Sequence, residues 1–199
     1  MNDVYKTIAF PSEEILFKEK NSKFYGYAFP INSEEDVKAL IDPLKKKHFN
    51  AVHFCYAFQT GTNPIYFRAN DDGEPSNSAG MPIYGQIQSF GVTNILVVIV
   101  RYFGGTKLGV PGLINAYKTA AKLAIENAMI AEMEIEEEVK FAFDYAEMNN
   151  VMRILKKEDP RIINQNMLAR AEMTLKIRED KVELLKAQLE LVKSLIFMA

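Results

Sequence analysis

An unbroken aliphatic run, Ile95–Val100, sets the strongest limit on how this chain can fold. Its residues do not alternate between apolar and polar, so the run predicts a central β-strand covered on both faces. Such a strand needs helices or a second sheet packed on either side of its own sheet. The run has only six residues, whereas a membrane-spanning helix needs roughly 20. It therefore indicates a buried core and not a membrane segment.

Shorter strands are predicted on the N-terminal side of this run. Residues 15–19 and 24–29 are typical of a β-hairpin, with a turn at Asn21-Ser22 between them. Residues 51–58 alternate, which places His53 and Cys55 on one face of a strand and the aromatic side chains on the other. The hairpin and the alternating strand indicate a sheet around the central run.

Two helices are predicted in the same half of the chain. Ser33 is followed by acidic residues and then by apolar residues at helical spacing, so we expect it to cap a helix over 34–47. A second helix is expected to begin after Ser76 or Ser78 and to continue to about Phe90. Together, these strands and helices predict an α+β fold.

After Glu138 the pattern starts again, with a strand, a helix, two strands, a helix and a short last strand. This order is that of a ferredoxin-like unit. We therefore predict two domains, over residues 1–132 and 133–199, each with its own apolar core.

Composition narrows the class of protein. Charged residues make up 25% of the chain, the net charge is −2 and the pI is about 5.8, which argues against a wholly basic nucleic-acid binder. The single cysteine, Cys55, excludes an intrachain disulfide. Because residues 1–5 also lack the basic start and apolar core of a signal peptide, we expect a cytoplasmic protein without membrane partners.

The densest polar cluster is Asp71-Asp72-Gly73-Glu74. Three carboxylates this close can hold Mg²⁺ or act as an acid–base pair. The alternative is a turn, in which Asp-Gly is a preferred pair for steric reasons. A third reading, metal or thiol chemistry at His53 and Cys55, is weaker than simple packing, because too few further His or Cys residues exist to complete a site. We expect no cofactor and no metal.

A glycine-rich segment follows the central strand. It runs from Arg101 and Tyr102 through Gly104, Gly105 and Lys107 to a helix predicted over 113–131. Backbone N–H groups of such a loop, with a helix N-terminus and a lysine, can hold an anion. A tight connection between packed elements explains the same glycines, so both readings stay open.

The charges along this region fit two interpretations, a buried sheet and helix in which charges are scarce, or a positive surface for an anion. Residues 75–125 are 51 positions without Asp or Glu, and four cations lie among them. On the predicted helix, Asn115, Lys118 and Lys122 share one face. We predict that these three residues, with Lys107, Arg101 and Tyr102 beside them, line a solvent-open anion surface.

Two long segments carry a resemblance to a known family. Residues 68–83, Arg-Ala-Asn-Asp-Asp-Gly-Glu-Pro-Ser-Asn-Ser-Ala-Gly-Met-Pro-Ile, resemble the signature of the Impact (YigZ) family, and so do residues 97–109. The stretch from His48 to Ala57 is similar as well. Pro111 and Asn115 depart from the glycine and the arginine usual in that family.

The resemblance implies a first domain like domain 2 of ribosomal protein S5 and a ferredoxin-like second domain, similar to late domains of elongation factor G. Both relatives act on RNA in the ribosome. Eukaryotic Impact proteins regulate the kinase that senses uncharged tRNA, largely through an additional N-terminal domain. The resemblance therefore implies work in translation, with RNA, the ribosome or a translation-control protein as partner.

Three hypotheses follow. The first, which we favour, is a non-catalytic translation- or ribosome-associated regulatory protein that binds RNA or another phosphate-bearing ligand. The second is a metal-dependent hydrolase or phosphoryl-handling enzyme that uses Asp71, Asp72 and Glu74. The third is a module that binds only proteins. No nucleophile with a matching base and orienting group is visible, which disfavours the enzyme.

The two motifs are also expected to meet in space. We predict that residues 71–78 and 101–112 are neighbours, with a carboxylate of the first bonded to Arg101 or to N–H groups of the Gly104-Gly105 loop. Arg68 and Ser76 would belong to the same composite site. A buried charge in such a site must be matched by a partner.

Overall fold

The structure is a computed structural model that describes residues 4–167 and 169–198. The chain divides into two compact units, Tyr5–Met133 and a second unit that begins at Glu134. Each unit has its own apolar core. Within the described residues, no helix is both long enough and apolar enough to cross a membrane.

The first unit is built on a five-stranded antiparallel sheet. Its strand order is β2-β3-β6-β4-β5. The strands are β2 (Ile15–Glu19), β3 (Ser22–Pro30), β4 (His53–Thr60), β5 (Tyr66–Asn70) and β6 (Ile95–Tyr102). The aliphatic run of β6 is fully buried at the centre of the sheet. The predicted hairpin and central strand are therefore confirmed.

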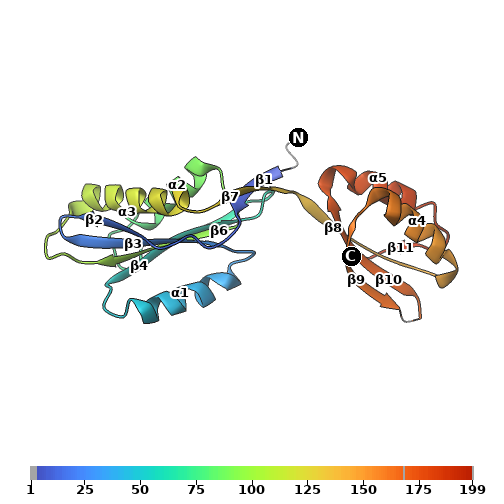
Figure 1. Cartoon of the computed structure of the whole chain (residues 1–199), viewed down its shortest axis with the longest axis horizontal. Coiled ribbons are helices and arrows are strands. Elements are labelled where there is room, and N and C mark those ends of the chain that lie inside the picture. The colour runs from blue at the N-terminus through green and yellow to red at the C-terminus, as the bar shows by residue number, and fades with distance from the viewer. Residues whose placement is uncertain (1–3, 168, 199) are drawn as a thin grey trace. The chain divides into compact units, whose positions relative to one another are not determined.

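Helices cover both faces of this sheet, as Figure 1 shows. One face packs against α2 (Gly80–Phe90) and α3 (Gly109–Glu126), and the other against α1 (Glu35–Lys47). The alternation in β4 follows from this arrangement. Cys55 faces α2 and α3, whereas Phe58 belongs to the core beneath α1.

Two predicted helix caps are wrong. Ser33 makes no capping bond, and the Asp36 carboxylate instead accepts the N–H groups of residues 32 and 33. Neither Ser76 nor Ser78 caps α2, because Asp71 accepts the N–H groups of residues 79 and 80. At α2 a carboxylate, which binds N–H groups more strongly than a hydroxyl does, takes the cap position, whereas Asp36 of α1 bonds to N–H groups that precede its helix.

The third helix differs from the one predicted over 113–131. It begins at Gly109, because Pro111 fits a first helical turn, where backbone N–H groups have no partner within the helix. It ends at Glu126, and the chain then forms β7 (Ile130–Glu134), which pairs with β1 (Val4–Ile8) in a two-stranded sheet.

The second unit places two helices on one face of a four-stranded antiparallel sheet of order β11-β8-β10-β9 (Figure 1). Its elements are β8 (Glu136–Phe143), a 3₁₀ turn η1 (Tyr145–Glu147), α4 (Met148–Glu158), β9 (Arg161–Met167), β10 (Ala171–Arg178), α5 (Glu179–Leu189) and β11 (Ile196–Phe197). Alternate residues of β10, from Ala171 to Ile177, are buried against the helices. Both units therefore combine helices with antiparallel sheets, as the α+β class requires.

Candidate functional site

The two sequence motifs meet in the interior of the first unit. Glu74 and Arg101 form an ion pair, with Oε1 2.5 Å from Nη1, and their side chains are only 4% and 6% exposed. The predicted contact between residues 71–78 and Arg101 is therefore confirmed. Because both charges are removed from water, each is matched mainly by the other.

Further contacts fix this pair in place. The Tyr117 hydroxyl of α3 donates to Glu74 Oε1 at 2.7 Å, and the Cys55 thiol donates to that hydroxyl at 3.3 Å. Burial raises the pKa of Tyr117 and that of Cys55, so both stay protonated and act as donors. His53 Nε2 lies 3.9 Å from the same carboxylate oxygen. Glu74 thus joins the turn, the sheet and α3.

Arg101 is held from its other sides by weaker contacts. Its guanidinium lies over the rings of Phe24 and Phe103, at 5.6 and 5.7 Å from their centroids. Nη2 is 3.5 Å from Ser22 Oγ, and Nε is buried without a partner among the described residues. These contacts describe a cation that organises the end of β6.

Asp71 and Asp72 do not join Glu74. Asp71 caps α2, with its Oδ1 2.9 Å from Ala79 N and 2.8 Å from Gly80 N. Asp72 Oδ2 accepts the N–H of Phe54 at 2.6 Å. The three carboxylates therefore accept hydrogen bonds at separate places. Across residues 4–167 and 169–198, no group of three or more His, Cys, Asp or Glu side chains is placed to hold a metal ion.

Arg68 and Ser76 also lie apart from the buried pair. Arg68 is exposed on β5 and forms an ion pair of 2.7 Å with Glu34 beside α1. With Phe54, Tyr56 and other residues it lines a cavity of about 360 Å³ on the α1 side of the sheet. Ser76 is exposed in the turn before α2. The structure therefore does not bring these two residues together with Arg101.

The predicted anion surface loses two of its members. Arg101 is buried and neutralised by Glu74, so its charge is not offered to solvent. Tyr102 follows it in β6 and therefore points to the other face of the sheet. There its hydroxyl lies 3.0 Å from His48 Nδ1. Sequence spacing placed the two residues together, but strand alternation separates them.

The glycines of the loop have a structural reason to be there. A Cβ on Gly104 would lie 2.1 Å from the backbone carbon of Asn21, so only glycine permits this close approach to the β2–β3 hairpin. Gly104 N also donates to Ser22 Oγ at 3.2 Å. Gly105 has φ +84°, a left-handed conformation that favours glycine. A tight connection between packed elements therefore explains why both positions are glycine.

The remaining predicted residues are exposed. Lys107 lies in the loop before α3, and Asn115, Lys118 and Lys122 lie on α3 itself. Lys122 is 3.6 Å from Glu126, one turn further along the helix. Among the residues that the structure describes, no ion pair involves Lys107 or Lys118. These two cations are open to an external anion.

A cavity between the two motifs was missed by sequence reasoning. It has a volume of about 310 Å³. Apolar side chains provide most of its lining, with the ion pair and one lysine among them; the residues include Glu74, Arg101, Phe103, Lys107, Val110 and Leu113. The only indication of the cavity in the sequence is the apolar residues between the glycines of the loop. Ordinary packing in the core explains such residues equally well.

A second polar cluster, also missed, lies on the α1 face of the sheet. The Tyr27 hydroxyl donates its proton to Glu14, and its oxygen lies 2.6 Å from His48 Nε2. Because that hydroxyl has one proton, His48 must donate from Nε2, and its Nδ1 then accepts from the Tyr102 hydroxyl. Burial lowers the pKa of His48, although the nearby Glu14 carboxylate acts to raise it. The imidazole is therefore neutral in this cluster.

Comparison with known proteins agrees with these motifs. Residues 20–125 match the family model of the Impact N-terminal domain. An IMPACT family member of Haemophilus influenzae is 31% identical over 184 residues, which cover 90% of this chain and 89% of the relative. The IMPACT family member YvyE of Bacillus subtilis is 31% identical over 153 residues, 77% of this chain and 70% of that protein.

A solved structure supports the same relationship. The crystal structure of a hypothetical protein superposes with a TM-score of 0.77 at 27% sequence identity, covering 100% of this chain and 98% of that one. The family model matches residues within the first unit, whereas the match to the Haemophilus influenzae relative, at 90% of the chain, extends into the second. On these grounds the chain belongs to the IMPACT family.

Proposed function

We propose that this chain is a non-catalytic regulatory protein of the cytoplasm that acts in translation or at the ribosome. It binds RNA, or another phosphate-bearing ligand, through a lysine face made of Lys107, Lys118 and Lys122. Asn115 on the same side of α3 supplies a neutral polar group, and Gly105 contributes its backbone N–H, since that of Gly104 is already bonded to Ser22 Oγ.

The observation that carries this proposal is that the last acidic residue before the lysines is buried. Glu74 is the last acid before the acid-free stretch, and it is buried against Arg101. Lys107 and Lys118 have no carboxylate partner within the described part of the chain. Exposed cations without local counter-charges attract a polyanion, and each phosphate they contact releases condensed counterions.

The architecture of both units is consistent with RNA-associated work. In the second unit, α4 connects β8 to β9 and α5 connects β10 to β11, with the strand order β11-β8-β10-β9. This pattern supports a ferredoxin-like assignment for that unit. For the first unit we propose the fold of domain 2 of ribosomal protein S5. Fold likeness is a weak guide to function, so the lysine face carries more weight.

The absence of catalysis is also part of the proposal. An enzyme using Asp71, Asp72 and Glu74 would need carboxylates that converge on one ligand. Asp71 is engaged by the N–H groups of α2, and Asp72 by the N–H of Phe54. Glu74 is matched by Arg101 and Tyr117. This geometry favours a structural role for the three.

The test measures binding to purified ribosomes by co-sedimentation, and to a fluorescent single-stranded RNA by anisotropy, over a series of salt concentrations. The double variant K107A/K118A should weaken binding and flatten the salt dependence, by about 0.7 in log–log slope for each lost contact to single-stranded RNA. Lys38 is exposed on α1, on the opposite face of the sheet. The variant K38A is therefore the matched control.

Two results would contradict the proposal. One is a K107A/K118A protein that binds ribosomes and RNA as tightly as the parent. The other is a K38A protein that loses as much affinity as the double variant, because loss of charge at any place would then have the same effect.

A further inference from the structure

We propose that the cavity of about 310 Å³ between the two motifs holds one nucleobase of a single-stranded RNA, stacked on Phe103. The inference rests on the proposed function and adds to it the part of the RNA that enters the protein. The lysine face would hold phosphates, and the cavity would hold a base.

The size of the cavity suits a single ring system. Small-molecule pockets range over roughly 300–1,000 Å³, and this cavity lies at the lower end of that range. Its walls include Phe103, Val110 and Leu113, which are apolar. A flat, weakly polar group fits such walls better than a hydrated phosphate does.

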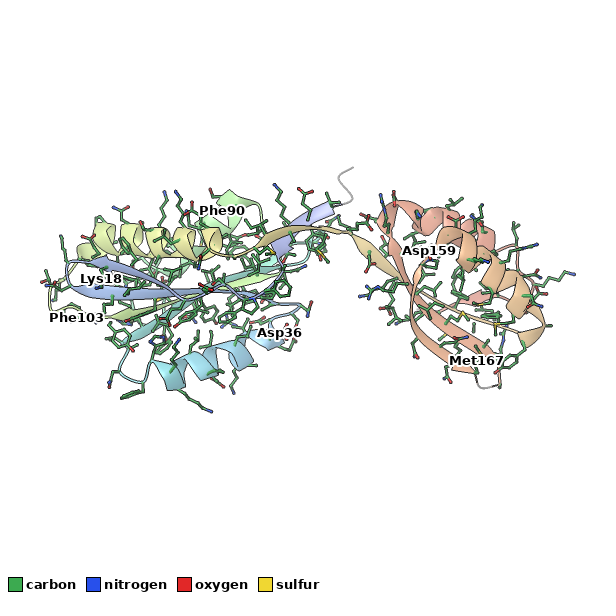
Figure 2. All side chains as sticks on the ribbon, in the orientation of Figure 1. Lys18, Asp36, Phe90, Phe103, Asp159 and Met167 are labelled. Atoms are coloured by element: carbon green, nitrogen blue, oxygen red, sulfur yellow. The ribbon has the colours of Figure 1, made fainter. Side chains whose placement is uncertain are left out.

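Phe103 is placed to act as a stacking ring. It follows β6 at one end of the unit, where Figure 2 labels it, and it is 49% exposed. The Arg101 guanidinium lies over this ring at 5.7 Å, and Arg101 is itself held by the buried Glu74. One side of the ring is therefore occupied by a fixed cation, while much of the ring stays open to solvent. An exposed aromatic ring is the usual platform for a base of single-stranded RNA.

The charges of the lining also favour a base inside the cavity. Glu74 and Arg101 neutralise each other, so a phosphate here would meet a carboxylate next to the guanidinium. A nucleobase is neutral and carries both donors and acceptors, which suits a lining with both kinds of group. Lys107 belongs to the same lining and is exposed, so it can meet the phosphate attached to that nucleoside.

An apolar side chain of a protein partner is the competing occupant. It would use the apolar walls, but it would leave Lys107 without an anion. A nucleotide uses the walls, the polar groups and the lysine together. The observations therefore favour the nucleotide.

The experiment uses the full-length chain and two fluorescent RNAs of ten nucleotides, one with bases and one in which every base is removed. The variants are F103A and F103W, with F49A as the control, because Phe49 is 80% exposed and lies outside the cavity. F103A should weaken binding of the intact RNA by roughly 5- to 150-fold, the range that corresponds to loss of one stacked base. It should leave binding of the abasic RNA unchanged, whereas F103W and F49A should bind both RNAs like the parent.

The outcomes separate this inference from the proposed function. If the parent binds intact and abasic RNA equally, and F103A weakens neither, the nucleobase site is wrong while binding through the lysine face stands. If the parent binds neither RNA and does not sediment with ribosomes, both are wrong, and a protein side chain becomes the better occupant. Circular dichroism of F103A confirms that a loss of binding is not a loss of fold.

Discussion

A polar cluster lies on each face of the five-stranded sheet. One cluster is built on an ion pair, and the other is built on a neutral histidine. On the α2 and α3 side, Glu74 is matched by a guanidinium, which stays charged at any pH that the protein meets. On the α1 side, Tyr27 and Tyr102 bracket a neutral histidine, His48. The first cluster is a fixed ion pair, and the second can gain a proton.

The difference originates in two adjacent residues of β6. Arg101 and Tyr102 project to opposite faces of the sheet, so one strand end contributes to both clusters. The cluster with the fixed charge lies beside the cavity of about 310 Å³. The titratable cluster lies away from this cavity. Substitutions on either side can test whether burial and charge type account for this division.

The largest effect is expected for R101M. Removing the guanidinium leaves Glu74 buried without a counter-charge, and breaking a buried pair in this way typically costs about 3–5 kcal/mol. The free energy of unfolding, measured by urea denaturation, should fall by about that amount. The loss should appear without any ligand, because the pair is inside the unit.

A double variant separates lost charge from lost packing. In E74Q/R101M no buried charge remains, so it should be more stable than R101M alone. If both proteins unfold at the same urea concentration, the ion pair is not the source of the stability, and the packing of the arginine stem on Phe24 and Phe103 is.

The contact between the two motifs could be predicted from the sequence, but the burial of the ion pair could not. The aliphatic run predicted the central strand, and the unusual density of special residues in the two motifs predicted their meeting. Spacing alone could not give the depth of Arg101, since a cation at the end of a strand is exposed or buried according to the elements packed over it. Tyr102 was misplaced because the two residues were treated as one surface patch, against the alternation of a strand.

The helix caps show a second limit. Capping rules relate a residue to N–H groups two or three positions later. Asp71 caps α2 from eight and nine positions earlier, through a loop whose shape the sequence does not state. The cavity was missed for a similar reason. Phe103, Val110 and Leu113 line it only because the turn at Glu74 comes back to the start of α3.

A smaller loss is expected for Y117F. This change removes the hydroxyl that donates to Glu74 at 2.7 Å, and a hydrogen bond to a charged group is worth about 1.5–3 kcal/mol. Tyr84 is the matched control, since it is also buried but donates to a neutral amide, Gln59 Oε1, at 3.2 Å. Y84F should cost about 0.5–1.5 kcal/mol. Equal losses in urea denaturation would show that Glu74 draws no special support from Tyr117.

The polar cluster on the α1 side should make the stability of the protein depend on pH. Burial lowers the pKa of His48 below its ordinary 6.5 in the folded protein. The unfolded chain therefore takes up a proton first as the pH falls, so this contribution to stability is complete above pH 6.5 and declines below it. The other titratable groups around the ring are Glu14, Tyr25, Tyr27, Lys47 and Tyr102.

The pKa of Glu14 is also lowered, and it adds to the decline at lower pH. Burial raises this pKa, but the hydrogen bonds from Lys47 and Tyr27 outweigh that effect. Urea midpoints of the parent should therefore decrease between pH 7 and 5. The variant H48Q has no imidazole to protonate and should show a weaker decrease. An unchanged pH profile in H48Q would show that the histidine is not the source of the decrease.

The smallest effect is expected for R68M, which tests whether burial is what separates the clusters from ordinary ion pairs. Arg68 and Glu34 are 2.7 Å apart, nearly the distance in the buried pair, but their side chains are 54% and 40% exposed. Hydrogen bonds from Tyr66 and Arg68 lower the pKa of Glu34. Water and salt screen such a pair, and holding two long side chains together costs conformational entropy. R68M should therefore unfold at the urea concentration of the parent, at low and at high salt alike. If R68M instead lost stability comparable to R101M, and regained none of it in salt, distance alone would govern both pairs, and the contrast between an interior ion pair and an exposed one would have no basis.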